Sequence, residues 1–201
     1  LPEITVIGTV GPFYEGSDYE FGWDFASKLE VPMVDEHYYV APTWMINNQR
    51  YYDKYDRNKP KVYLGEYATW GNTLYNALSE ALHLCNVERN ADVVSMTSYA
   101  PLLAKEGFTQ WNPDLIWFDN LRMMRTPNYY VQQMYGMNAG TDVLSLKMDG
   151  KAVAGQDSLY ATAALNAPTG EIILKLVNAS SKPADVQIDF NGLKKRQLVA
   201  G

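Results

Sequence analysis

Two short segments place ionisable side chains at the ends of predicted β-strands, where they could act on a bound molecule. Glu66 follows Gly65 at the end of an otherwise apolar run over residues 61–68. His37 and Tyr39 end a second run, and their i, i+2 spacing puts both side chains on one face of a strand. A carboxylate in such a position can serve as a nucleophile or as a general acid or base. Taken singly, each segment also fits a solvated glutamate or a hydrogen-bonded structural histidine.

The first two-thirds of the chain alternate strand and helix patterns. The most regular helical pattern covers residues 74–88, where apolar side chains recur at i, i+3, i+4, i+7, i+8 and i+11. Alternating strands and helices predict βα units with a parallel sheet, and four such units are half of an eight-stranded (β/α)8 barrel. We expect strands over residues 4–9, 32–39, 61–68 and 91–99, and helices over 21–29, 43–56, 74–88 and 129–135.

Beyond about residue 140 the pattern changes to short strands separated by turn residues. Apolar runs over residues 143–148, 159–165, 171–178 and 184–190 are divided by Asp-Gly, Pro-Thr-Gly and Ser-Ser-Lys-Pro segments. Such spacing is typical of an antiparallel β-sandwich or jelly roll. We therefore predict an α/β chain in which residues 1–139 form half of a (β/α)8 barrel and residues 140–201 form part of a β-sandwich.

Composition excludes several classes of function. The formal net charge of −6 argues against a nucleic-acid partner, which requires clustered Lys and Arg side chains. The single cysteine, Cys85, lies in an apolar helical run and is expected to be buried, and no stretch is long enough to span a membrane. The two histidines lie on different predicted elements, so we expect no metal site, and no glycine-rich phosphate loop or other cofactor motif is present.

Seven motifs lie at residues 35–39, 42–44, 55–57, 65–68, 81–90, 98–102 and 111–114. Taken together in order and spacing, they resemble those of glycoside hydrolase family 51 α-L-arabinofuranosidases. The resemblance implies a (β/α)8 barrel joined to a jelly-roll sandwich and retaining hydrolysis of terminal α-L-arabinofuranosyl groups from arabinan- or arabinoxylan-type polysaccharides. It further implies that the four strands are barrel strands five to eight, that Glu66 is the nucleophile, and that His37 and Tyr39 bind substrate.

The same resemblance predicts that the catalytic pair is incomplete in this chain. A retaining glycosidase needs two carboxyl groups about 5 to 5.5 Å apart. The family's acid/base is the glutamate of an Asn-Glu pair at the end of strand four, before the segment present here, and no Asn-Glu dipeptide occurs in the chain. Glu36 should point away from the barrel axis, Glu80 and Glu88 belong to an outer helix, and Asp35 is a weak alternative.

We therefore expect the chain by itself to be nearly inactive and to cover its open sheet by self-association or by pairing with the missing half of a barrel. Two other functions remain open from the sequence. One is a barrel glycosidase acting on β-xylosides or β-glucans, and the other is a non-catalytic carbohydrate-binding or scaffolding module. The substrate class favours an extracellular or periplasmic protein.

Overall fold

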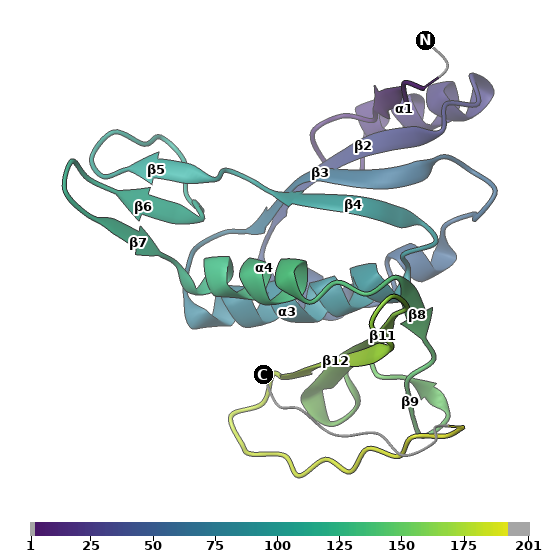
Figure 1. Cartoon of the computed structure of the whole chain (residues 1–201). Coiled ribbons are helices and arrows are strands. Elements are labelled where there is room, and N and C mark those ends of the chain that lie inside the picture. Colours follow the sequence, from purple (N-terminus) through teal and green to yellow (C-terminus); the bar gives the residue numbers. More distant parts are fainter. Residues whose placement is uncertain (1–2, 193–201) are drawn as a thin grey trace.

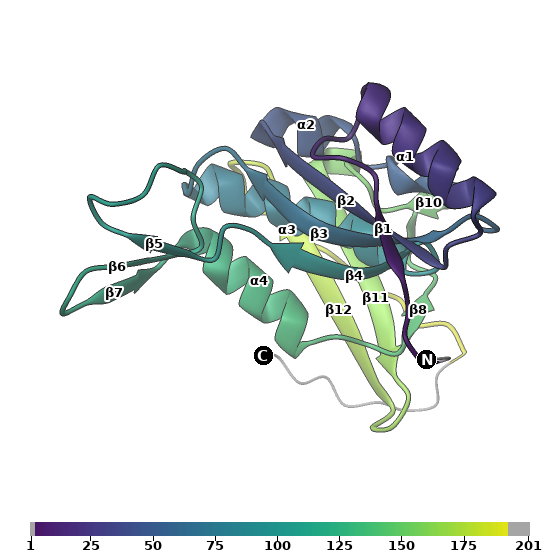
Figure 2. The same cartoon turned by 90° about the horizontal axis from the view of Figure 1, so that it is seen from above.

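The computed structural model describes residues 3–192, and its centre is a four-stranded parallel sheet with the strand order β1-β2-β3-β4. Figure 2 shows the four strands side by side in sequence order. The predicted parallel arrangement of the first part is thus confirmed for the described residues. The strands are β1 Ile7–Thr9, β2 Met33–Val40, β3 Lys61–Thr69 and β4 Val94–Tyr99.

Four α-helices connect or follow these strands. The longest, α3, begins after Thr73, which forms a capping box with Asn76, and it carries the apolar stripe predicted from the sequence. Helix α4 begins after Thr126, whose hydroxyl accepts a hydrogen bond from the Tyr129 amide. In Figure 1, α3 and α4 lie side by side beneath the sheet. The helices are α1 Ser17–Lys28, α2 Pro42–Asn47, α3 Leu74–Arg89 and α4 Pro127–Met137.

The helix predicted over residues 43–56 is wrong in extent. Helix α2 ends at Asn47, and only a short 3₁₀ turn, Tyr52–Lys54, follows it. Asn48 caps α2 with non-helical backbone angles, and its side chain donates to the Trp44 carbonyl. Asparagine side chains compete in this way for backbone hydrogen bonds and favour the end of a helix. The residue types over 43–56 do not reveal where that competition ends the helix.

A second sheet, not predicted from the sequence, follows β4. It contains β5 Leu103–Lys105, β6 Ile116–Phe118 and β7 Met123–Arg125, with β5 and β6 parallel and β6 and β7 antiparallel. These strands are three residues long, too short for an alternating pattern to identify them. The sheet projects from the rest of the molecule beyond the end of β4 (Figure 1).

The last part of the described chain is antiparallel, as predicted. A three-stranded sheet has the order β12-β11-β8, and β9 pairs with β10. The predicted strand over residues 184–190 is absent: these residues are exposed, and no described strand pairs with them. Residues 193–201, the end of the predicted second domain, lie outside the described residues. The strands are β8 Asp142–Leu144, β9 Lys147–Met148, β10 Lys151–Ala152, β11 Leu159–Asn166 and β12 Glu171–Asn178.

The main apolar core lies between the parallel sheet and its helices. Leu64 and Tyr67 of β3 pack in it with Leu82 of α3, all three fully buried, and the same core includes Tyr160 and Val177 of the antiparallel sheet. Strands β11 and β12 lie on the far side of α3 from the parallel sheet (Figure 1). Among the described residues no helix is both long enough and apolar enough to cross a membrane.

Candidate active site

The three predicted site residues lie together on the face of the parallel sheet that the helices leave uncovered. Along β2 the buried positions alternate with partly exposed ones, and His37 and Tyr39 are among the partly exposed set. His37 is paired in register with Glu66 of β3, and paired residues of a parallel ladder lie on the same face. The geometry therefore brings Glu66, His37 and Tyr39 into one cluster.

A β-bulge at Gly65 puts Glu66 on this face. Glu36 pairs with Leu64 and the next residue, His37, pairs with Glu66, so Gly65 is an extra residue in β3. Because side chains alternate between faces, a regular strand would have placed Glu66 on the same face as the buried Leu64. The bulge thus turns the carboxylate from the core to the open face.

A side chain at the bulge position would overlap the Asp35 carboxylate. A Cβ atom at Gly65 would lie 2.0 Å from Asp35 Oδ1 and 3.2 Å from His37 Nε2. The first distance is far below van der Waals contact, so any larger residue would displace the Asp35 side chain. The Asp35 carboxylate takes up the space that a side chain at position 65 would need.

One oxygen of the Glu66 carboxylate is held and the other is free. The Tyr39 hydroxyl donates to Glu66 Oε2 at 2.8 Å, and His37 Nδ1 lies 3.6 Å from the same oxygen. Among the described residues no group donates to Oε1, and the Glu66 side chain is 43% exposed. Burial, followed by the hydrogen bond and negative charge of Glu66, raises the pKa of Tyr39, so its hydroxyl stays protonated as a donor. A carboxylate in this state can attack with its free oxygen.

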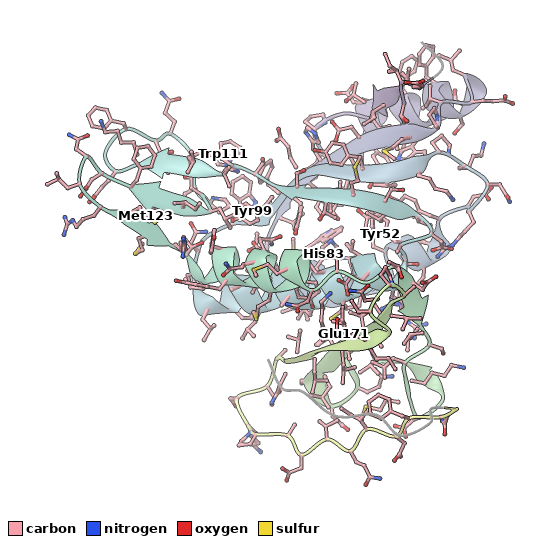
Figure 3. All side chains as sticks on the ribbon, in the orientation of Figure 1. Tyr52, His83, Tyr99, Trp111, Met123 and Glu171 are labelled. Atoms are coloured by element: carbon pink, nitrogen blue, oxygen red, sulfur yellow. The ribbon has the colours of Figure 1, made fainter. Side chains whose placement is uncertain are left out.

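Two tryptophans flank Tyr39 and form an aromatic wall beside the carboxylate. The ring centroids of Trp111 and Trp70 lie 5.1 Å and 5.8 Å from that of Tyr39, and both indoles are partly exposed. Trp111 lies where the small sheet joins the parallel sheet (Figure 3). Flat apolar faces with polar edges suit contact with sugar rings. Trp70 was not predicted from the sequence, although its place four residues after Glu66, just beyond the end of β3, could have indicated it.

Glu36 lies on the opposite face, as expected, and is buried behind the site. Its carboxylate accepts hydrogen bonds from Tyr55, Trp23 and other side chains that link α1 to the segment after α2. Burial raises the pKa of Glu36 to about 7, although these hydrogen bonds act to lower it. Glu36 is therefore part of the scaffold behind His37. Its neighbours include Tyr19 and Tyr52.

The second histidine belongs to the core. His83 is fully buried on α3, and its Nε2 forms a 2.8 Å hydrogen bond with the Tyr38 hydroxyl. Burial lowers the pKa of His83 to about 3, so the ring is neutral. Figure 3 shows His83 near Tyr52, between the sheet and α3. His83 thus supports β2 from the helix side and does not reach Glu66.

Within residues 3–192 no group of three or more His, Cys, Asp or Glu side chains is arranged to hold a metal ion.

Cys85 is buried, as predicted, and its sulfur is 3.0 Å from the Tyr135 hydroxyl. Burial raises the pKa of the Cys85 thiol to about 11, which keeps it from acting as a nucleophile.

Comparison with known proteins identifies the family. Residues 65–201 match the model of the α-L-arabinofuranosidase C-terminal domain, and this stretch includes Glu66. The chain therefore belongs to the α-L-arabinofuranosidase C-terminal domain family, and the resemblance predicted from its motifs is confirmed. It is 48% identical over 146 residues to an extracellular exo-α-L-arabinofuranosidase of Streptomyces chartreusis, and 31% identical over 166 residues to α-L-arabinofuranosidase 1 of Arabidopsis thaliana.

The aligned segments cover 73% and 79% of this chain but only 18% and 24% of those two relatives. The chain thus spans about a quarter or less of the length of the curated relatives it matches.

Solved structures agree with this assignment. An arabinose-bound α-L-arabinofuranosidase of glycoside hydrolase family 51 superimposes with a TM-score of 0.74 at 28% identity, over 90% of this chain and 29% of that protein. The family 51 arabinofuranosidase of Xanthomonas axonopodis pv. citri superimposes with a TM-score of 0.59 at 19% identity, over 88% of this chain and 44% of the other. The second likeness concerns the fold alone.

Proposed function

We propose that this chain supplies the nucleophile side of the active site of a retaining α-L-arabinofuranosidase, with Glu66 as the nucleophile. The proposal rests on the surroundings of the Glu66 carboxylate. It stands on the open face of the sheet, one oxygen is bound by Tyr39 and faced by His37, and the other oxygen is free. Membership of the arabinofuranosidase family supports arabinofuranosyl groups as the substrate.

In the proposed reaction Glu66 Oε1 attacks the anomeric carbon of a terminal α-L-arabinofuranosyl group. A bond forms between that oxygen and the anomeric carbon as the glycosidic bond breaks, and the leaving oxygen receives a proton from a general acid. Water, deprotonated by the same group, then attacks the anomeric carbon and releases Glu66 as a carboxylate. Tyr39 holds Oε2 throughout by its hydrogen bond, and His37 and Tyr39 orient the sugar.

The general acid is proposed to come from outside this chain. Asp35 is hydrogen bonded to His37, and Asp114, whose charge acts on Tyr39, is buried. Glu36 and Glu80 are buried among the helices, and Glu88 is paired with Lys175. None of these is free on the open face to protonate a leaving group, so the chain alone should be nearly inactive.

We also propose that residues 1–139 are strands five to eight of a (β/α)8 barrel and that residues 140–201 are part of a β-sandwich. A parallel sheet with helices on one face, open edges at β1 and β4, and a polar cluster at the strand ends supports this arrangement. The chain alone should then cover its open face by self-association or by pairing with the other half of the barrel. Sedimentation that gives a single monodisperse monomer would contradict this expectation.

The function is tested in the full-length protein that contains this chain. Wild type should hydrolyse an aryl α-L-arabinofuranoside and leave aryl β-xylosides and β-glucans nearly unreacted. Glu66→Gln should abolish turnover, since an amide cannot form the glycosyl ester, whereas the exposed Glu15→Gln should leave turnover unchanged. Near-normal activity of Glu66→Gln would refute the assignment, and sugar binding without any hydrolysis by wild type would favour a non-catalytic module.

A further inference from the structure

Asp35 lies beside the cluster of Glu66, His37 and Tyr39, and the proposed reaction does not use it. It lies two residues before His37 on β2 and therefore on the same, open face of the sheet. Its Oδ2 atom is 2.9 Å from His37 Nε2. Its Oδ1 atom is buried, and no described protein group donates a hydrogen bond to it. A buried carboxylate oxygen without a donor is costly, so the position of this side chain needs an explanation.

The contacts of His37 give that explanation. An ionised carboxylate only accepts hydrogen bonds, so the contact with Asp35 requires a proton on Nε2 of the ring. The other nitrogen, Nδ1, then faces Glu66 Oε2 at 3.6 Å. This distance is longer than a hydrogen bond, yet it puts Nδ1 beside the oxygen that Tyr39 binds. Asp35 thus determines both the orientation of the ring and which nitrogen faces Glu66.

Gly65 connects Asp35 to the β-bulge. Asp35 Oδ1 occupies the space where a Cβ atom of residue 65 would lie, 2.0 Å away. The extra residue in β3 therefore has two consequences: it turns Glu66 to the open face, and it makes room for the carboxylate that holds His37. Because both depend on the same missing side chain, Asp35, His37 and Glu66 form one geometric unit.

We infer that Asp35 is a positioning residue for the reaction, acting through His37 on the nucleophile Glu66. The inference rests on the proposed function, in which Glu66 is the nucleophile. Asp35 fixes the imidazole with its Nε2 proton directed away from Glu66 and its Nδ1 atom directed toward it. With Oε2 bound by the Tyr39 hydroxyl and flanked by the His37 ring, Oε1 is the oxygen presented to the anomeric carbon. Asp35 itself does not touch the substrate.

The kinetic test uses Asp35→Asn in the full-length protein, because asparagine has nearly the same shape but can also donate to Nε2. We expect kcat on an aryl α-L-arabinofuranoside to fall about 10- to 100-fold while KM changes less than about threefold. His37→Gln should be similarly impaired, and adding Asp35→Asn to it should cause little further loss, since Asp35 acts through that ring. Full additivity of the two losses, or an Asp35→Asn kcat within about twofold of wild type, would overturn the inference.

A second measurement separates positioning from general structural damage. Ring ¹⁵N spectra of ¹⁵N-histidine-labelled protein, with His37 identified as the signal lost in His37→Gln, report which nitrogen bears the proton. Wild type should have the proton on Nε2, and Asp35→Asn should shift it partly or wholly to Nδ1. Unchanged His37 signals would refute the inference. So would a failure of both Asp35→Asn and Asp35→Ala to fold, since a structural role would then dominate.

The two proposals fail in different ways. If wild type hydrolyses no α-L-arabinofuranoside, or if Glu66→Gln remains active, the proposed function is wrong. The His37 ring signals still report in that case whether Asp35 controls the tautomer. If Glu66→Gln is inactive and the His37 ring signals are the same in wild type and Asp35→Asn, the proposed function is supported and the role of Asp35 is refuted.

Discussion

The Tyr39 hydroxyl donates a 2.8 Å hydrogen bond to Oε2 of Glu66, and this bond links the side chains of the adjacent parallel strands β2 and β3. The two residues are 27 positions apart in the chain, and their side chains meet because both stand on the open face of the sheet. The Tyr39 ring also contacts Trp70 and Trp111, so packing and the hydrogen bond act on the same side chain.

Tyr39→Phe should separate these two contributions. The phenylalanine ring keeps the contacts with both indoles, but Glu66 loses a donor to its carboxylate. A hydrogen bond to a charged group contributes about 1.5 to 3 kcal/mol, so kcat/KM should fall about 10- to 100-fold with little change in Tm. Tyr63→Phe is the matched control, because the Tyr63 hydroxyl bonds Ser98 on the neighbouring strand. Equal losses in the two variants would argue against a specific role for Tyr39.

Gly65→Ala should destabilise the fold as well as impair the site. The added methyl group would overlap Asp35 Oδ1 and force the side chain or the backbone to move. Overpacking of this kind costs about 1 to 3 kcal/mol, which chemical denaturation can measure. Gly136→Ala is the control, because a Cβ there meets nothing within 4 Å and alanine favours the helix. The prediction fails if Gly65→Ala is as stable as wild type.

The sequence predicts the positions of the main strands and helices well where a pattern extends over several turns or residues. The apolar stripe of α3, and the β-branched and aromatic residues of β2 and β3, each extend over enough positions to be recognised. The grouping of His37, Tyr39 and Glu66 also follows from strand ends meeting at one edge of a parallel sheet. The positions of these elements and the grouping of the three side chains depend only on local sequence patterns and on the topology of βα units.

Other features depend on partners distant in the sequence. The bulge at Gly65 is one residue long, and a strand pattern alone gives no means to decide which face Glu66 takes after it. The three-residue strands β5 to β7 are defined by their mutual pairing. Conversely, residues 184–190 have an alternating pattern and no strand partner among the described residues, so a strand does not form. In each case, whether a strand forms depends more on a pairing partner than on the intrinsic strand preference of its residues.

Stability should fall as the pH rises from about 4.5 to about 7. Burial raises the pKa values of Glu36 and Glu80 from 4.5 to about 7, so over this range the folded protein binds protons that the unfolded chain has released. Their contribution is complete below pH 4.5 and is lost above pH 7. Each group can contribute about 3 kcal/mol to the change, by the free energy equivalent of the pKa difference.

Glu36→Gln mimics the protonated side chain and should remove its share of this dependence. Urea denaturation at several pH values would measure the slope. The exposed Glu171→Gln should retain the wild-type slope, because its carboxylate remains in water in both states. A wild-type protein that gains stability between pH 5 and 7 would contradict the prediction, since other titrating groups would then outweigh these two.

The ion pair between Lys175 of β12 and Glu88 of α3 should stabilise the contact between the antiparallel sheet and the helix layer. The Lys175 and Glu88 side chains are 10% and 24% exposed, and the ammonium lies 4.8 Å from the centre of the Tyr135 ring. Lys175→Met leaves the Glu88 carboxylate without its partner in a site whose burial already raises its pKa. Removing one member of a largely buried pair should cost about 2 to 4 kcal/mol, measured by urea denaturation.

The exposed pair of Lys28 and Asp24 provides the comparison. Their side chains are 70% and 58% exposed, so Lys28→Met should change stability by less than about 0.5 kcal/mol. Adding Glu88→Gln to Lys175→Met should restore part of the lost stability, because it removes the unpaired charge. If Lys175→Met costs no more than Lys28→Met, the pair does not hold the two layers together, and the shared apolar core around Tyr160 and Val177 must do so alone.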